Sequence, residues 1–261
     1  MTQTSQLKLC IPAEGRLSSA FNEVASYAGL CLKQHIKRCS FGFIEDTYNP
    51  FDRSDWSLSS ELESFFQQYP VESAEAIIEK QPDMFDSMEN YGVDAAIMGS
   101  DKLLENTFMR RSRNLQPAFQ VTARFKKLEQ TAISRLMICG PDIVNSPQEL
   151  SGKCIATSYP NLTQAWLTDK GVTNANVIVK TSRVEDMIRR GAANAVCDVV
   201  ETGGTLKAYD YTPSLKVARV YPVLVESLKT SKATMNNMRK RLKLAVNPAR
   251  PVPETNSLTP A

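Results

Sequence analysis

The sequence CDVVETGGTL, Cys197–Leu206, leads from a short apolar strand into a turn of small and hydroxyl-bearing residues. Residues 202–205, Thr-Gly-Gly-Thr, offer consecutive backbone N–H groups and two hydroxyls, and the glycines have no Cβ to keep a ligand away. Asp198 and Glu201 stand just before them, where carboxylates suit sugar hydroxyls or a Mg²⁺ ion carried by a ligand. We interpret the segment as a site for a phosphorylated ribose, with an ordinary hairpin turn as the alternative.

The order of strand, turn and helix recurs along the chain. Residues 93–98, VDAAIM, predict a buried strand that runs into Gly99–Asp101 and then a helix, and KCIAT at 153–157 predicts another strand before a helix that carries Trp166. Further strands are expected at 7–12, 135–139, 176–179 and 195–200, and further helices at about 18–27 and 184–190. Such alternation predicts an α/β fold with mostly parallel sheets.

Composition narrows the class of protein. The 261 residues, 42% hydrophobic and 23% charged, suffice for one large domain or two small ones, and we expect two lobes. A formal charge of +3 favours a small anionic ligand over nucleic acid. Six single cysteines and one histidine, His35, argue against a structural metal site. No apolar run has the length that crosses a membrane and no signal peptide is evident, so we expect a cytoplasmic protein rather than an exported solute-binding protein.

Two segments differ from this pattern. Residues 47–81 are rich in Ser, Glu, Gln and aromatic residues with prolines between them, which predicts a surface insertion with one or two short helices. After a strand-like stretch at 215–227, a basic amphipathic helix is expected at about 233–246, and residues 247–261 should form a disordered tail.

Several blocks stand in the order typical of one enzyme family: IPAEGRLS, GVDAAIMGSDKLLE, KCIATSYPNLTQAWLTDKG, RVEDMIRRGAANAVCDVVETGGTLKA and VARVYPVLV. Over residues 6–245, apart from the insertion, the chain closely resembles the catalytic portion of ATP phosphoribosyltransferase, a glycosyltransferase that begins histidine biosynthesis. The resemblance implies a two-lobed fold of the periplasmic-binding-protein type II class, with the active site between the lobes. It also implies a reaction in which N1 of the ATP adenine displaces pyrophosphate from C1 of phosphoribosyl pyrophosphate, with Mg²⁺ arriving on the substrate.

The resemblance assigns roles residue by residue. Asp198 would lie near the ribose, Glu185 takes the family's acidic position ahead of the loop, and Arg16 would face the nucleotide or a phosphate. The helix that begins after residue 159 would hold a pyrophosphate or triphosphate oxygen at its N-terminus. The implied substrate-binding residues are Gly99, Ser100, Asp101, Thr157, Ser158, Tyr159, Glu201, Thr202, Gly203, Gly204, Thr205 and Leu206. Each also has a structural alternative: Arg16 on a surface helix, Asp101 as an N-cap, and residues 158–160 as a helix start without a ligand.

The resemblance also predicts the organisation of the chain. Residues 1–118 and 212–246 would form lobe I, and residues 119–211 lobe II with the phosphoribosyl loop. Similarity to the short form implies a homo-oligomer, at least a dimer, with a regulatory subunit that resembles histidyl-tRNA synthetase. Glu14, in place of the family's lysine, and the altered segment 182–187 leave a second hypothesis open. In that hypothesis the chain is a catalytically altered member that binds a phosphorylated ligand or regulates a partner.

Overall fold

The computed structural model describes residues 7–13, 21, 30–33, 41–46, 68, 73–124, 134–230 and 235–240. The chain forms two compact units, each built from several segments. Unit 1 contains Met1–Gly99, Ala118–Leu128 and Pro222–Glu254, and unit 2 contains Ser100–Pro117, Glu129–Tyr221 and Thr255–Ala261.

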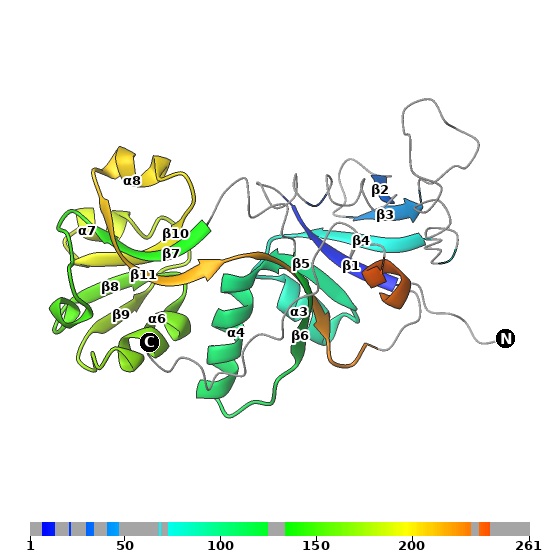
Figure 1. The fold of residues 1–261 in the computed structure, drawn as a ribbon, viewed down its shortest axis with the longest axis horizontal. Helices are drawn as coiled ribbons and strands as arrows, with labels where there is room; N and C mark the ends of the chain where they lie inside the picture. Colours follow the sequence, from blue (N-terminus) through cyan, green and yellow to red (C-terminus); the bar gives the residue numbers. More distant parts are fainter. Residues whose placement is uncertain are drawn as a thin grey trace. The chain divides into compact units, whose positions relative to one another are not determined.

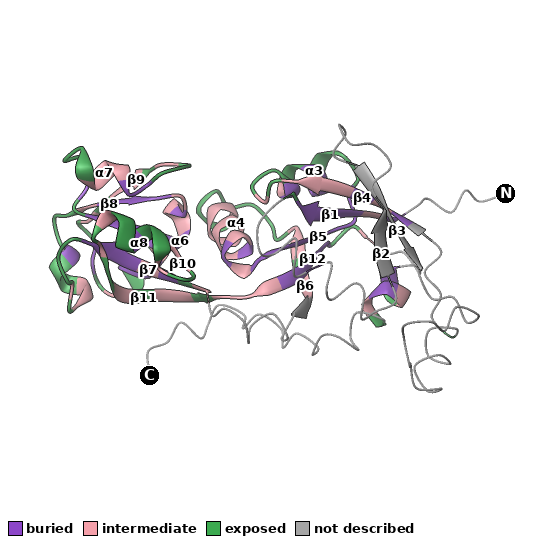
Figure 2. Cartoon of the chain, turned by 90° about the horizontal axis from the view of Figure 1, so that it is seen from above, coloured by how far each residue is buried: buried purple, intermediate pink, exposed green. Residues whose placement is uncertain are grey.

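Unit 1 is built on a seven-stranded sheet with the order β2-β3-β4-β1-β5-β12-β6 (Figure 1). Its elements are β1 (Leu7–Pro12), β2 (Leu30–Lys33), β3 (Phe41–Asp46), β4 (Ser73–Glu79), α3 (Met84–Asn90), β5 (Ala95–Gly99), β6 (Phe119–Arg124) and β12 (Pro222–Ser227). Strand β1 pairs in parallel with β4 and with β5. Strands β1 and β5 are almost wholly buried, as Figure 2 shows, because their sequences are nearly continuous apolar runs.

The prediction of a surface insertion over residues 47–81 is wrong for the C-terminal end of that range. Residues 73–79, SAEAIIE, form β4 inside the sheet, between β1 and β3, and Ala74 and Ala76 are fully buried. Alanine and glutamate are depleted in strands, so the local sequence gives little sign of β-structure, and pairing with β1 decides the outcome. Most of the remaining insertion lies outside the described residues, as do Glu14, Arg16 and all but Phe21 of the helix expected at 18–27.

Unit 2 is built on a five-stranded sheet with the order β11-β7-β10-β8-β9. Its elements are α4 (Ser100–Ser112), β7 (Ser134–Gly140), a 3₁₀ turn (Pro147–Leu150), β8 (Cys154–Thr157), α6 (Pro160–Asp169), β9 (Asn176–Val179), α7 (Asp186–Arg189), β10 (Ala195–Val200), α8 (Gly204–Tyr209) and β11 (Thr212–Val220). Its main core combines strand residues with the inner face of α6; among its members are Leu136, Ile138, Ile155, Leu162, Trp166, Leu167 and Cys197.

Both sheets are mixed, so the expectation of mostly parallel sheets is wrong. In unit 2, β8 pairs in parallel with β10 and with β9, whereas β7 is antiparallel to β10 and to β11. The stretch expected as one strand at 215–227 forms two, β11 in one sheet and β12 in the other, separated at Tyr221. Because β12 returns between β5 and β6 and is antiparallel to both, it adds antiparallel pairs to unit 1 as well.

The units differ from the expected lobes at three elements. Helix α4 and strand β11 belong to unit 2, although residues 1–118 and 212–246 were expected in lobe I. Strand β6 belongs to unit 1, although residues 119–211 were expected in lobe II. Helix α4 packs against α6, and β11 pairs with β7 along its length. The residues that make these contacts lie far apart in sequence, so a local sequence pattern does not reveal the contacts.

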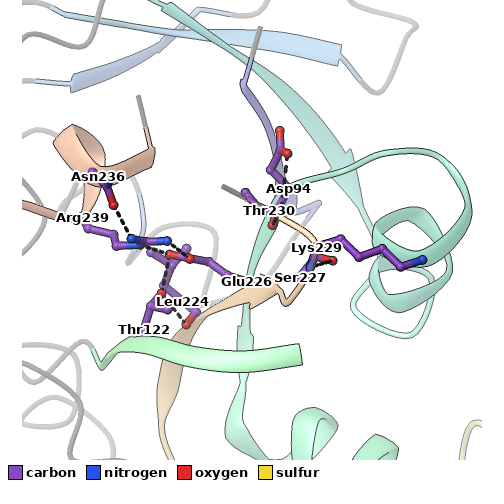
Figure 3. Close-up of polar contacts among 9 residues, drawn as sticks. All are labelled: Asp94, Thr122, Leu224, Glu226, Ser227, Lys229, Thr230, Asn236 and Arg239. Carbon is purple, nitrogen blue, oxygen red and sulfur yellow. Dashed lines mark hydrogen bonds and ion pairs between the residues drawn. The ribbon is translucent and has the colours of Figure 1, made fainter. Parts of the chain in front are cut away.

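An ion pair between a partly exposed arginine and a buried carboxylate connects residues 235–240 to the sheet of unit 1. Residues 235–240 are helical, within the predicted amphipathic helix, and Met235 and Met238 are buried. Arg239 reaches from this helix to the fully buried carboxylate of Glu226 on β12, as Figure 3 shows. The Thr122 hydroxyl donates to the same carboxylate, with an O–O distance of 2.7 Å. The carboxylate is therefore charge-paired and hydrogen-bonded, as burial of an ion requires.

Candidate functional site

The loop after β10 has the geometry of an open strand-to-helix turn. Gly203 lies in the left-handed region with φ 71° and ψ 10°, and α8 begins at the next residue. The hairpin alternative is therefore excluded, because the turn leads into a helix and not into a paired strand. A Cβ added at Gly204 would meet only Thr202 Oγ1, at 3.8 Å. The backbone conformation at 203 thus favours glycine, whereas glycine at 204 leaves space on the outer side of the turn.

Most of the loop faces solvent. Glu201, Thr202, Gly204 and Thr205 are exposed, while Leu206 is 7% exposed and anchors the start of α8 in a second core cluster of unit 2. Glu201 accepts a hydrogen bond from the Ser134 hydroxyl at 3.5 Å. The exposed backbone and hydroxyls form a surface that a compact anion can reach.

The two glycines should respond differently to alanine. We expect Gly203→Ala to lower the free energy of unfolding by about 1–2 kcal/mol, because alanine is strained in the left-handed region. Gly204→Ala should leave stability unchanged or raise it by up to about 1 kcal/mol, because a helical alanine restricts the unfolded chain. Urea denaturation of both variants measures the difference. Equal losses in the two variants would contradict the role given to Gly203.

Asp198, on β10 ahead of the loop, is half-buried in a region with several carboxylates. Burial raises the pKa of its carboxyl to about 6, and the negative charges of Glu185 and Asp101 act in the same direction. The Val199 N–H, which donates to Asp198 Oδ1 at 2.8 Å, and the positive charge of Lys102 oppose this rise in pKa. Asp198 is therefore mostly ionised at pH 7, at the cost of holding a charge in a poorly hydrated place.

The altered segment 182–187 is held against α8. Glu185, 9% exposed, stands at the start of α7, and its main-chain carbonyl accepts a hydrogen bond from the Tyr211 hydroxyl at 3.2 Å. Asp186 accepts from the Tyr209 hydroxyl at 2.9 Å, and Arg189 stacks over the Tyr209 ring, 5.2 Å from its centroid. Asp186 therefore has a structural purpose in this chain: it links α7 to the helix that follows the loop.

Asp101 and Tyr159 are buried and form a hydrogen bond with each other. The Tyr159 hydroxyl donates to Asp101 Oδ2 at 2.6 Å, and each residue is 4% exposed. Burial and the neighbouring Asp101 charge raise the pKa of Tyr159 far above its usual range. The N-cap alternative for Asp101 is wrong, because α4 begins at Ser100 and Asp101 lies inside its first turn; its carboxylate instead joins α4 to the residue before α6.

Thr157 connects the ends of two neighbouring strands through hydrogen bonds. Its fully buried hydroxyl donates to the carbonyl of Cys197 at 2.7 Å and accepts from the Tyr159 N–H at 2.9 Å. This pair of hydrogen bonds fixes the end of β8 beside β10, one residue before Asp198. Ser158, the middle residue of the predicted turn, is half-buried.

A protein carboxylate caps the N-terminus of α6. The N–H groups of Asn161 and Leu162 donate to Glu105 of α4 at 3.0 and 2.8 Å, and the Asn161 amide donates to the same carboxylate at 2.7 Å. The expectation that this N-terminus holds a phosphate oxygen is therefore wrong for these two amides, because an anion from the chain itself already occupies them.

The turn after β5 is also internally bonded. The Gly99 N–H donates to Gln81 Oε1 at 2.9 Å, within unit 1. Ser100 donates through its N–H to the Tyr221 carbonyl at 2.7 Å, and its hydroxyl accepts from the Tyr221 N–H at 2.9 Å. These contacts give both residues a structural function at the ends of β5 and β11. Sequence reasoning overlooked Lys102, which follows them in the first turn of α4.

A family model described as ATP phosphoribosyltransferase matches residues 80–244, well over half of the chain. The chain belongs to the ATP phosphoribosyltransferase family. The match covers most of the described residues and every candidate site residue except Arg16.

Solved structures agree with this family assignment in fold. One is the ATP phosphoribosyl transferase (HisG:HisZ) complex from Thermotoga maritima, at 20% identity and a TM-score of 0.62, with 92% of this chain and 98% of that chain covered. Another is protein AF1704 from Archaeoglobus fulgidus, at 9% identity and a TM-score of 0.52, with 93% and 76% covered. The predicted α/β fold of the periplasmic-binding-protein type II class is confirmed, with mixed sheets.

Within this ATP phosphoribosyltransferase fold, unit 2 holds most of the candidate site. Asp198, Glu185 and the loop at 201–206 belong to β10, α7 and α8, which follow one another in sequence and share one core cluster. The described residues contain no group of three or more His, Cys, Asp and Glu residues placed to hold a metal ion. Among the same residues, no helix is long and apolar enough to span a membrane.

Proposed function

We propose that this chain is the catalytic subunit of an ATP phosphoribosyltransferase that opens histidine biosynthesis. In the proposed reaction, N1 of the adenine of ATP attacks C1 of phosphoribosyl pyrophosphate, the C1–N1 bond forms, and the bond from C1 to pyrophosphate breaks. The observation that carries the proposal is the open loop at 201–206 after β10, in a chain of this family. Its exposed amides and hydroxyls suit the 5-phosphate, and Asp198 stands where the ribose would follow.

The proposed chemistry requires positioning and electrostatics rather than a protein nucleophile. Positive charge develops at C1 as the pyrophosphate departs, so an ionised carboxylate at Asp198 stabilises the transition state and accepts hydrogen bonds from ribose hydroxyls. Glu185 adds a second negative charge nearby, as its effect on the pKa of Asp198 indicates. A Mg²⁺ ion carried on the pyrophosphate group of the substrate would neutralise part of the leaving-group charge. Asp198 and Glu201 are the oxygen donors at the loop that could reach such an ion.

The loop assignment predicts a defined loss of affinity. We expect Thr205→Ala to weaken binding of phosphoribosyl pyrophosphate by about 1–3 kcal/mol, because the variant loses a hydrogen bond to a charged phosphate. Isothermal titration calorimetry of both proteins measures this change. Thr173→Ala, the same substitution at an exposed position of unit 2 outside the loop, should bind like the parent chain. Unchanged affinity in the Thr205 variant would reject the assignment of the loop to the 5-phosphate.

The same proposal extends to assembly and location. We infer a cytoplasmic homo-oligomer, at least a dimer, that works with a regulatory subunit similar to histidyl-tRNA synthetase. The structural similarity to a complex of two ATP phosphoribosyltransferase components from Thermotoga maritima supports the partner.

The altered segment 182–187 supports a second candidate function. Asp186 and its bond to Tyr209 lie next to Glu185, so the approach to the ribose differs from the family pattern in a way that the structure stabilises. In this alternative the chain binds a phosphorylated ligand without turnover or regulates a partner enzyme. Phosphoribosyl pyrophosphate would then bind to the loop, and no product would form.

A further inference from the structure

Lys102 is a cation whose position the mechanism above does not use. It lies in the first turn of α4, near the positive end of the helix dipole, where a lysine is electrostatically unfavourable. Its ammonium lies 3.9 Å from the centroid of the Tyr159 ring, close enough for a cation–π contact. The side chain is half-buried, and within the described part of the chain no carboxylate lies within salt-bridge distance of its ammonium. The contact with Tyr159 therefore holds the ammonium in position, and no carboxylate of the described residues pairs with its charge.

The same ammonium belongs to the surroundings of Asp198. Its positive charge lowers the pKa of Asp198, which places it within electrostatic range of that carboxylate. A chain of contacts connects the two: Lys102 stacks on Tyr159, the Tyr159 N–H donates to the Thr157 hydroxyl, and that hydroxyl donates to the carbonyl of Cys197, the neighbour of Asp198. Each of these contacts lies within unit 2.

Two features of the kind that attract anions, an exposed loop and an ammonium, thus lie near Asp198 at the ends of two neighbouring parallel strands. The loop at 201–206 follows β10, and Lys102 lies over Tyr159 in the turn that follows β8. The carboxyl ends of parallel strands meet at one edge of a sheet, where ligands of α/β folds bind. Phosphoribosyl pyrophosphate also carries two anionic groups, one at each side of its ribose.

We propose that Lys102 binds the pyrophosphate group of phosphoribosyl pyrophosphate and holds it as the leaving group, opposite the 5-phosphate on the loop. This inference rests on the proposed transferase function and adds a residue to it. The ammonium donates to pyrophosphate oxygens, and its charge offsets the negative charge that collects on the pyrophosphate when its bond to C1 breaks. The stacking on Tyr159 keeps the ammonium in place before the substrate arrives.

Binding of substrate fragments tests this assignment. The fragments are ribose 5-phosphate, which reports on the loop, and magnesium pyrophosphate, which reports on Lys102; phosphoribosyl pyrophosphate contains both. In calorimetry, Lys102→Met should lose about 10- to 100-fold in affinity for pyrophosphate and for the whole substrate, the range for a hydrogen bond to a charged group. Its affinity for ribose 5-phosphate should stay within about twofold of the parent chain, because the loop is unchanged. Lys102→Arg should recover most of the lost affinity, because arginine keeps the charge.

The controls separate binding from folding and from the proposed function. Lys153→Met, at an exposed position of unit 2, should bind all three probes like the parent chain. An equal loss for pyrophosphate and ribose 5-phosphate in Lys102→Met, or no loss for either, would overturn the assignment of Lys102. Failure of the parent chain to bind phosphoribosyl pyrophosphate or ribose 5-phosphate would instead overturn the proposed function.

Discussion

Replacement of Arg239 by methionine is expected to lower the free energy of unfolding by about 3–5 kcal/mol, because it leaves the Glu226 carboxylate buried without its charge partner. Glu226 is fully buried on β12, in the middle of the stretch that pairs with β5 and β6. Only the Thr122 hydroxyl would remain of its side-chain partners among the described residues. Guanidinium denaturation of the parent chain and the variant measures the loss.

A double variant shows whether the unpaired charge causes the loss. Glu226→Leu combined with Arg239→Met removes both charges, and it should be markedly more stable than Arg239→Met alone. The Thr122 hydroxyl then faces an apolar neighbour, which accounts for a residual loss of about 1 kcal/mol. If Arg239→Met costs less than about 1 kcal/mol, the pair does not hold the C-terminal helix to the sheet as described.

Asp198→Asn is expected to make the free protein more stable at pH 8 and at the same time to abolish its function. The carboxyl has a pKa of about 6 in the folded state, above its value of 3.8 without the protein environment. Its protonated form is thus favoured by folding, so the stability it contributes is present below about pH 4 and is lost as the pH rises through about 6. At pH 8 the ionised carboxylate lowers stability by about 1–3 kcal/mol, and asparagine removes this cost.

The pH dependence is the distinguishing readout for Asp198. Between pH 5 and pH 8, unfolding of the asparagine variant should lack the decline in free energy that Asp198 adds to the parent chain. Its affinity for phosphoribosyl pyrophosphate should fall by at least about tenfold, because the ribose loses a charged acceptor. Asp142→Asn, at an exposed position of unit 2, should change neither quantity. An asparagine variant that is less stable than the parent chain at pH 8 would contradict the raised pKa of Asp198.

The sequence predicts those elements of the fold whose pattern is local. Strands at 7–12, 176–179 and 195–200 are found at the predicted residues, because continuous apolar runs and flanking turn residues define them. The position of the loop at 201–206 follows from the same local pattern. Strand β4 was missed because its alanines and glutamates become strand only through pairing with β1 and β3.

The hydrogen-bond partners of the candidate site residues could not be predicted from the sequence. Asp101 and Tyr159 are 58 positions apart, and only the packing of α4 against α6 turns two candidate ligands into one buried hydrogen bond. Glu105 caps α6 for the same reason, across 56 positions from Asn161. The loop at 201–206 is exposed because its own backbone determines its conformation, whereas long-range contacts decide which other polar groups remain accessible.

The formation of phosphoribosyl-ATP tests the central claim most directly. Purified chain is incubated with ATP, phosphoribosyl pyrophosphate, Mg²⁺ and pyrophosphatase, with and without a candidate regulatory subunit, and the N1-substituted adenine is detected by ultraviolet absorbance and mass spectrometry. We predict product in at least one of the two mixtures and none when Asp198→Asn replaces the parent chain. Absence of product from both mixtures, with protein that still binds phosphoribosyl pyrophosphate, would contradict the transferase proposal and identify the chain as a binding member of its family.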